Sequence, residues 1–178
     1  MKIALVVGHN ERAQGARRAT DRRSEFDWNG DLAEMIHELA PDDTRIFWRT
    51  PQGGYTQEIR RVYAAVDAWG ADCSLELHFN AATPAATGCE TLSSGTRGSL
   101  ALAGLVQEFT LAAMPMRDRG VKIRSQLERG GLSLWAGRAP AIMTEPYFGS
   151  NRGDCAIADD HKSMLAEATL EAAREFCR

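Results

Sequence analysis

The stretch IALVVGH, residues 3–9, decides the fold. Its five apolar residues, Ile3 to Val7, stop at Gly8, which is typical of a short strand covered on both faces. A strand of this kind belongs to the interior of a sheet that has helices on either side. The polar residue His9 follows directly, so we expect its side chain at the carboxyl end of the strand.

Outward from this strand, strand-like and helix-like patterns alternate along the chain. Further strands are predicted at 45–49, 73–78, 90–93 and 139–145. Helices are predicted from Glu25 to the Pro41 stop, along a stripe at 59–66 that ends near Gly70, from Ser99 to Ala113, and from Asp159 or Asp160 to Phe176. This alternation predicts one α/β domain over residues 1–178, with a mixed, largely parallel sheet of about six strands flanked by helices.

Three finer expectations concern the segments between and along these elements. Residues 115–138 are expected to be loop-rich, with a turn at Gly130-Gly131. Residues 10–23 are polar and hold five arginines, which is typical of an exposed loop. The side chains expected to face inward include Leu39 in the first helix and, in the last helix, the four-residue repeat Met164, Ala168, Ala172 and Phe176.

Composition excludes several classes of protein. The chain has 178 residues, of which 44% are hydrophobic and 25% charged, and its net charge of −3 gives no general affinity for nucleic acid. No stretch is long enough to cross a bilayer. The apolar run 3–7 is too short for a signal-peptide core, so we expect synthesis in the cytoplasm. The four cysteines form no CxxC pair and are expected to be free thiols.

Three residues at predicted strand ends indicate a site: His9, His78 and Glu145. In open α/β sheets, sites lie beyond the carboxyl ends of the strands. Two histidines and a carboxylate are a known ligand set for catalytic zinc. The helical signature H-E-x-x-H is absent, because His37-Glu38 is followed by Pro41 where the second histidine would stand. A metal site would therefore combine distant segments; otherwise the histidines only make hydrogen bonds at strand ends.

Seven segments, in order, resemble the zinc-dependent N-acetylmuramoyl-L-alanine amidases. The matching segments are Val7-Gly8-His9, Gly15-Ala16, Glu25 with Asn29, Leu77 to Ala81, Gly88-Cys89-Glu90, Arg119 to Lys122, and Pro140 to Glu145 continuing through Phe148, Ser150 and Asn151. The resemblance extends over nearly the whole chain. The chain departs from the family at Asn10-Glu11, where a glycine-rich continuation is usual, and at Pro146-Tyr147, where a small or aliphatic pair is common.

The resemblance implies a function and a set of residues. It implies that His9, Glu25 and His78 bind Zn²⁺ and that Glu145 is the catalytic acid and base. The implied reaction is hydrolysis of the amide bond between the lactoyl group of N-acetylmuramic acid and L-alanine in peptidoglycan. Without the metal, Glu25 would simply be a first-turn glutamate favoured by the helix dipole.

Substrate contacts are less defined by the sequence. Asn80, Arg17 and Trp135 are candidates, although Asn29 and Asn80 are better suited to orienting ligands or backbone. Arg17 belongs to the arginine-rich loop, for which simple solvation is the alternative. Trp135 lies in the loop-rich region and is the best-placed tryptophan for a glycan contact. The segment between His78 and Glu145 leaves little room for an inserted regulatory helix, which predicts a constitutively competent module.

Two other functions fit the same residues. One is a different zinc peptidase or amidohydrolase that cuts within the stem peptide. The other is a wall-binding or phage-particle component that has lost catalysis. We expect a monomer that acts on the cell wall after release or delivery by another component, as phage or prophage endolysins and tail-associated lysins do.

Overall fold

Six strands form one sheet in the computed structural model, which describes residues 1–178. The strands are β1 (Ile3–Val7), β2 (Thr44–Trp48), β3 (Cys73–Leu77), β4 (Cys89–Ser93), β5 (Asp118–Ile123) and β6 (Ala141–Glu145). Their order in the sheet is β2-β1-β3-β6-β4-β5, and β4–β6 is the one antiparallel pair. The predicted mixed, largely parallel sheet is confirmed.

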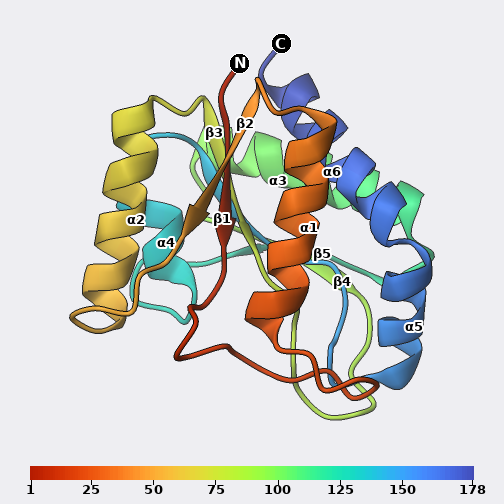
Figure 1. Ribbon diagram of the computed structural model, residues 1–178. Coiled ribbons are helices and arrows are strands. Elements are labelled where there is room, and N and C mark those ends of the chain that lie inside the picture. Colours follow the sequence, from red (N-terminus) through yellow and green to blue (C-terminus); the bar gives the residue numbers. More distant parts are fainter.

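Helices cover both faces of this sheet (Figure 1). They are α1 (Glu25–Leu39), α2 (Tyr55–Trp69), α3 (Arg97–Ala113), α4 (Gly131–Ala136), α5 (Arg152–Asp160) and α6 (Lys162–Phe176). Helices α2 and α4 pack on one face, whereas α1, α3 and α6 pack on the other. The result is a three-layer α/β/α domain, in agreement with the predicted class.

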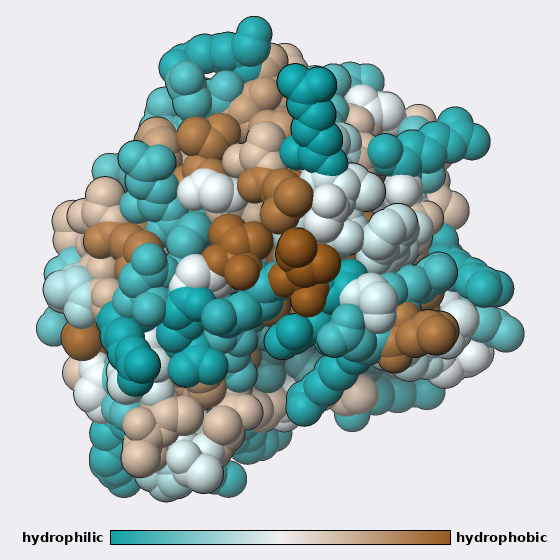
Figure 2. Space-filling model, turned by 180° about the vertical axis from the view of Figure 1, so that it is seen from behind, coloured by the Kyte–Doolittle hydropathy of each residue, from teal (hydrophilic) through white to brown (hydrophobic).

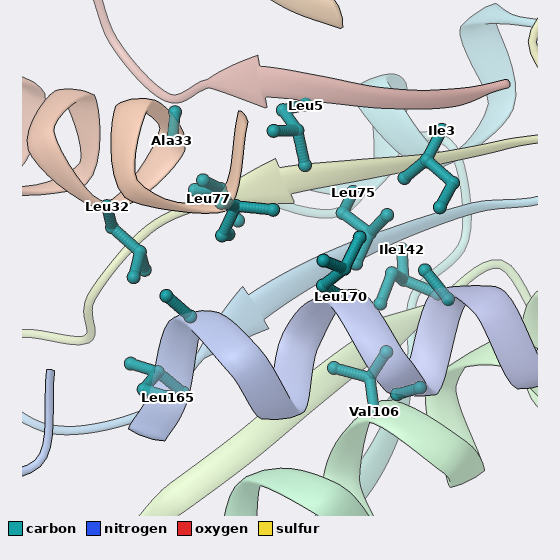
Figure 3. Close-up of a cluster of buried hydrophobic side chains, with 14 of the residues drawn as sticks. Ile3, Leu5, Leu32, Ala33, Leu75, Leu77, Val106, Ile142, Leu165 and Leu170 are labelled. Atoms are coloured by element: carbon teal, nitrogen blue, oxygen red, sulfur yellow. The ribbon is translucent and has the colours of Figure 1, made fainter. Parts of the chain in front are cut away.

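The larger core lies between the sheet and helices α1, α3 and α6 (Figure 3). Strand side chains such as Leu5, Leu75 and Ile142 point toward Val106 of α3 and Leu170 of α6. All five residues of β1 are fully buried. Their burial on both faces explains the unbroken apolar run with which the chain begins.

The two chain ends lie together at one end of the sheet (Figure 1). The Met1 amine is 3.8 Å from Asp43 Oδ1, and Arg174 of α6 donates to Asp43 Oδ2 at 3.0 Å. The parallel strands run away from this end. Their carboxyl ends therefore meet at the opposite side of the domain.

Residues 115–138 contain more regular structure than predicted. Strand β5 and the short helix α4 both lie in this segment. Strand β5 is half-exposed at the edge of the sheet, so its sequence shows no buried apolar run. The loop-rich prediction missed these two elements because both lack the periodicity of longer, buried ones, whereas the predicted turn at Gly130 is present.

The last part of the chain forms two helices. The predicted last helix is present as α6, but His161 precedes it at the cap position instead of Asp159 or Asp160, and the preceding helix α5 was not predicted. Asn151 caps α5 by accepting hydrogen bonds from the amides of Gly153 and Asp154, and Asp160 ends this helix. Of the residues of α6 predicted to face inward, Ala172 is buried and Phe176 packs against the core, whereas Met164 is 43% exposed. The buried residues of α6 are Leu165, Ala166, Thr169, Leu170, Ala172 and Ala173. Leu39 of α1, also predicted to face inward, is 48% exposed.

The arginine-rich loop is not uniformly solvated. Arg18 is 1% exposed and donates hydrogen bonds to Asp21 at 2.7 Å and Asp159 at 2.6 Å. Its guanidinium also lies over the Trp28 ring, 5.8 Å from the centroid. Arg18 therefore ties this loop to α1 and α5, because a buried guanidinium requires charged partners.

The surface is mixed in polarity. Seen from the side opposite to that of Figure 1, apolar side chains gather near the middle of the face, among hydrophilic ones (Figure 2). Large exposed hydrophobic residues of the molecule include Ile123, Leu127 and Trp135. None of the helices is both long enough and apolar enough to span a bilayer.

Candidate active site

Strand register places the predicted site residues side by side. Val7 of β1 is paired with Leu77 of β3, and Leu77 is paired with Thr144 of β6. His9, His78 and Glu145 therefore emerge at the carboxyl ends of three adjacent strands. The inference from parallel-strand topology that they share one edge is confirmed.

Glu25 reaches the same edge from the first turn of α1. Ser24 caps this helix, and its hydroxyl accepts a hydrogen bond from the Asp27 amide at 3.1 Å. The Glu25 carboxylate is further held by the Ala16 amide, which donates to Oε1 at 3.1 Å. The side chain is thus fixed from its own helix start and from the preceding loop.

The two histidines and Glu25 form a compact cluster. Glu25 Oε2 is 3.1 Å from His9 Nε2 and 2.9 Å from His78 Nδ1. One donor atom from each residue lies within 4.8 Å of the other two. Glu25 and His78 are buried, whereas the His9 side chain is 27% exposed. One side of the cluster is therefore open to solvent.

Two glycines permit this close approach. A Cβ at Gly8 would lie 2.4 Å from His78 Nε2, and one at Gly15 would lie 2.6 Å from the His9 ring. Gly15 also has a φ of +78°, which other residues rarely adopt. Both glycines lie in segments that carry the family resemblance, and they are required by the packing of the histidines.

Glu145 differs from the cluster in having an unsatisfied oxygen. Its Oε2 is buried and has no hydrogen-bond partner. Burial raises the pKa of Glu145 to about 8; the nearby His78 opposes this rise, and the carboxylates of Glu25 and Glu90 add to it. A buried polar atom without a partner is unusual in a folded protein and often marks a functional group.

The cluster itself has strongly shifted pKa values in the absence of a metal. Burial opposes the charged form of Glu25, but hydrogen bonds from His78 and His9 lower its pKa to about 2. Burial likewise opposes protonation of His78, but hydrogen bonds to Glu25 and Glu76 raise its pKa to about 10. The negative charge of Glu25 therefore stabilises the protonated form of His78. The same charge would favour a bound cation at this position.

Two observations indicate that these residues are suited to binding a zinc ion. The donor set, two imidazole nitrogens and one carboxylate oxygen, is used by catalytic zinc sites that leave a coordination position open. In addition, His78 presents Nδ1 to the cluster while its Nε2 is 3.1 Å from Glu76 Oε1. A carboxylate on the remote nitrogen is the usual partner of a metal-binding histidine.

Sequence reasoning gave no role to three charged residues near this edge. Glu90 is paired with Glu145 across the antiparallel strands β4 and β6, and Arg119 Nε donates to Glu90 Oε2 at 2.6 Å. Glu76 lies within β3, behind His78. Glu90 and Arg119 could have been found, because both lie in segments that carry the family resemblance.

The three predicted substrate contacts differ in their exposure and hydrogen bonds. Asn80 donates to Glu90 Oε1 at 2.8 Å, and its own Oδ1 accepts from the Ala81 amide. Arg17 is exposed and donates to the Arg22 carbonyl. Trp135 is 43% exposed, and its indole NH donates to the Arg124 carbonyl. A substrate role for Asn80, Arg17 and Trp135 stays a prediction.

Asn29, predicted to orient the site, donates to the Glu25 carbonyl at 2.9 Å, one turn earlier in α1. This hydrogen bond lies within the helix that carries Glu25. Its effect is to stiffen the helix turn from which the carboxylate projects.

Solved structures share this fold over almost the full chain. An N-acetylmuramoyl-L-alanine amidase from Clostridium difficile 630 has a TM-score of 0.82 at 22% identity, covering 99% of this chain and 96% of that chain. The catalytic domain of the CD27L endolysin targeting Clostridia difficile has a TM-score of 0.82 at 20% identity, covering 98% and 97%. AmiC2 of Nostoc punctiforme, an N-acetylmuramoyl-L-alanine amidase, has a TM-score of 0.80 at 17% identity, covering 99% and 97%.

The sequence itself also matches a family. No curated protein matches the chain, but the family model described as N-acetylmuramoyl-L-alanine amidase matches residues 3–175. This match includes every residue of the candidate site. The chain belongs to the N-acetylmuramoyl-L-alanine amidase family.

Proposed function

We propose that the chain is a zinc-dependent amidase, with His9, Glu25 and His78 as ligands. Its reaction is hydrolysis of the amide bond between the lactoyl group of N-acetylmuramic acid and L-alanine in peptidoglycan. The observation that carries the proposal is the meeting of three donor atoms within 4.8 Å at the strand edge that also bears Glu145. Family membership supports the choice of this amide bond over others.

The chemistry divides between the metal ligands and Glu145. A bound Zn²⁺ ion would lower the pKa of a coordinated water to about 7 and polarise the amide carbonyl. Glu145 takes a proton from the attacking water through its unpartnered Oε2. It then delivers this proton to the leaving nitrogen of L-alanine, which completes cleavage of the amide. The buried surroundings of Glu145 suit it to holding and releasing a proton at one place.

The test is Glu145→Gln, which preserves shape and removes the proton acceptor. We expect the variant to retain one zinc per chain, measured by elemental analysis. Its turnover on purified peptidoglycan should fall by about 10²- to 10⁴-fold, the usual contribution of a general acid–base group. Glu108→Gln, at an exposed glutamate of α3, is the matched control and should retain both zinc and turnover.

Mass spectrometry of the products separates this function from its rivals. Glycan strands free of peptide together with intact stem peptides support the amidase. Fragments cut within the stem peptide would instead identify a zinc peptidase of different specificity. Protein that binds the wall but shows neither zinc nor turnover would overturn the proposal in favour of a binding component.

A further inference from the structure

A pair of buried carboxylates and one arginine lie behind the histidines. Arg49 follows β2 and is 7% exposed, Glu58 lies in the first turn of α2, and Glu76 is in β3 with 1% exposure. Arg49 Nη2 donates to Glu58 Oε2 at 3.2 Å, and its Nη1 is 3.9 Å from Glu76 Oε1. We call Arg49, Glu58 and Glu76 the charge hub. Buried ions of this kind are often no more stabilising than apolar residues, so stability alone does not explain them.

One arm of the charge hub leads to His78. Glu76 Oε1 is 3.1 Å from His78 Nε2, while Tyr63 donates its hydroxyl to Glu76 Oε2 at 2.9 Å. The other ring nitrogen, Nδ1, is the atom that faces Glu25. Glu76 therefore fixes both the orientation of the ring and the nitrogen that carries the proton.

The other arm leads to His9 through Asn10. Asn10 Nδ2 donates to Glu58 Oε2 at 2.8 Å, and Asn10 Oδ1 accepts from the amides of Arg12 and Ala13. These bonds close the turn that follows His9. His9 has a φ of +68°, which is unfavourable for a residue with a Cβ. Asn10 is also where the chain departs from the glycine-rich pattern of its family, so a side chain here holds a turn that glycines otherwise form.

We propose that the charge hub positions both histidine ligands, with Arg49 joining the two arms. The inference rests on the proposed zinc function and assigns positioning residues that do not contact substrate. Loss of one carboxylate should release one histidine from its binding orientation. The metal should then bind more weakly even though all three ligands remain.

The test compares zinc affinity in Glu76→Gln and Glu58→Gln with that of the unchanged protein. Zinc dissociation constants are measured on metal-free protein by competition with a chromophoric chelator. Glu76→Gln should weaken binding about 10- to 100-fold, the usual effect of losing a partner of a metal-binding histidine. Glu58→Gln should weaken it less, because it acts through Asn10. Glu34→Gln, at an exposed glutamate of α1, should leave it unchanged.

Two further readouts distinguish positioning from a general loss of stability. The visible spectrum of Co²⁺-loaded protein should change in Glu76→Gln, because it reports ligand geometry, whereas circular dichroism should show an intact fold. In metal-free protein, the imidazole Nε2 proton of His78 should exchange slowly with solvent and faster in Glu76→Gln. This second readout tests the hydrogen bond between Glu76 and His78 in protein that contains no metal.

The outcomes separate this inference from the proposed function. Absence of zinc binding by the unchanged protein would overturn the proposed function, and the inference with it. If the unchanged protein binds zinc, a folded Glu76→Gln variant with affinity within twofold and an unchanged Co²⁺ spectrum would overturn only the inference. If Glu76→Gln does not fold, Tyr63→Phe replaces it: this variant removes only the hydroxyl on Glu76, and unchanged affinity there would overturn the inference too.

Discussion

The half of the site around Glu25 and Glu76 differs from the half around Glu145 in how carboxylate oxygens are satisfied. Glu25 contacts both histidines and a backbone amide, and Glu76 contacts His78 and Tyr63. Glu145 has a buried oxygen with no partner. Complete pairing fixes geometry, as metal binding requires, whereas an unpaired carboxylate is available for proton transfer. The first half is therefore suited to holding a metal ion, and the second to proton transfer.

The largest effect is expected from removing a histidine from the paired half. His78→Ala should lower zinc affinity by more than about 100-fold, since loss of an outer partner alone costs about 10- to 100-fold. Activity on peptidoglycan should disappear with the metal. Elemental analysis after dialysis and a turnover assay measure the two effects. His37→Ala is the control, because His37 contacts Thr44 far from the cluster; equal loss in both variants would contradict the assignment.

Arg119→Gln should disturb the reactive half without touching the ligands. Arg119 neutralises Glu90, which faces Glu145 across β4 and β6. Without this cation, repulsion from Glu90 should raise the pKa of Glu145 further. We expect kcat/KM at neutral pH to fall roughly tenfold and the acidic limb of its pH profile to move upward by up to about one pH unit.

The control for that variant is Arg117→Gln, since Arg117 is exposed two residues earlier. Its pH profile should be unchanged. A fall in kcat/KM of Arg119→Gln with no movement of the limb would mean that Arg119 acts in substrate binding instead.

In metal-free protein, the raised pKa values of Glu145 and His78 should make stability depend on pH. The folded pKa of Glu145 is about 8 and that of His78 about 10, both above their ordinary values. Unfolding therefore releases protons from Glu145 between about pH 4.5 and 8, and from His78 between about pH 6.5 and 10, so stability falls as pH rises through these windows. We expect Tm to drop by several degrees from pH 6 to 9.

Glu145→Gln should flatten the first of these windows and leave the second. The lowered pKa of Glu25 works in the opposite direction, so stability should also decline as pH falls from about 4.5 toward 2. Saturating zinc should reverse the trend between pH 5 and 7, because the ligands must lose protons to bind the metal. A metal-free Tm that rises from pH 6 to 9 would contradict the assigned shifts.

The smallest effect is expected at Trp135, the predicted glycan contact. Trp135→Ala should raise KM for peptidoglycan about fivefold with kcat nearly unchanged, corresponding to about 1 kcal/mol of lost stacking. Trp48→Ala is a matched control, because both indoles are 43% exposed. Equal changes in the two variants would remove Trp135 from the list of glycan contacts.

Much of the fold, and the meeting of His9, His78 and Glu145 at one edge, could be predicted from local sequence. Ile3–Val7 is buried on both faces and so is uniformly apolar, and parallel strands place their carboxyl ends at one edge. Glu25 was harder, because a first-turn glutamate is common in any helix. Its proposed role rests on the family resemblance, and its contact with both histidines is seen in the structure.

What could not be predicted depends on partners distant in sequence. Arg18 reads as part of a solvated run, yet Asp159 and Trp28 bury it. Glu76 stands in the middle of a strand, where only Arg49 and Tyr63 from other elements explain a charge. Hydrophobic periodicity along the sequence gives no information about such pairings. The half-exposed edge strand β5 was missed for the converse reason, since too few of its residues are buried to leave a pattern.

The shared position of the chain ends at one end of the sheet has a practical consequence for engineering. A fluorescent protein, affinity tag or cell-wall adhesion module fused to either end would emerge on the side remote from His9 and Glu145. A short linker joining Met1 to Arg178 would likewise allow new ends to be opened in a surface loop. Fusion and circular permutation should therefore both be tolerated, and neither should block access of a polymeric substrate to the site.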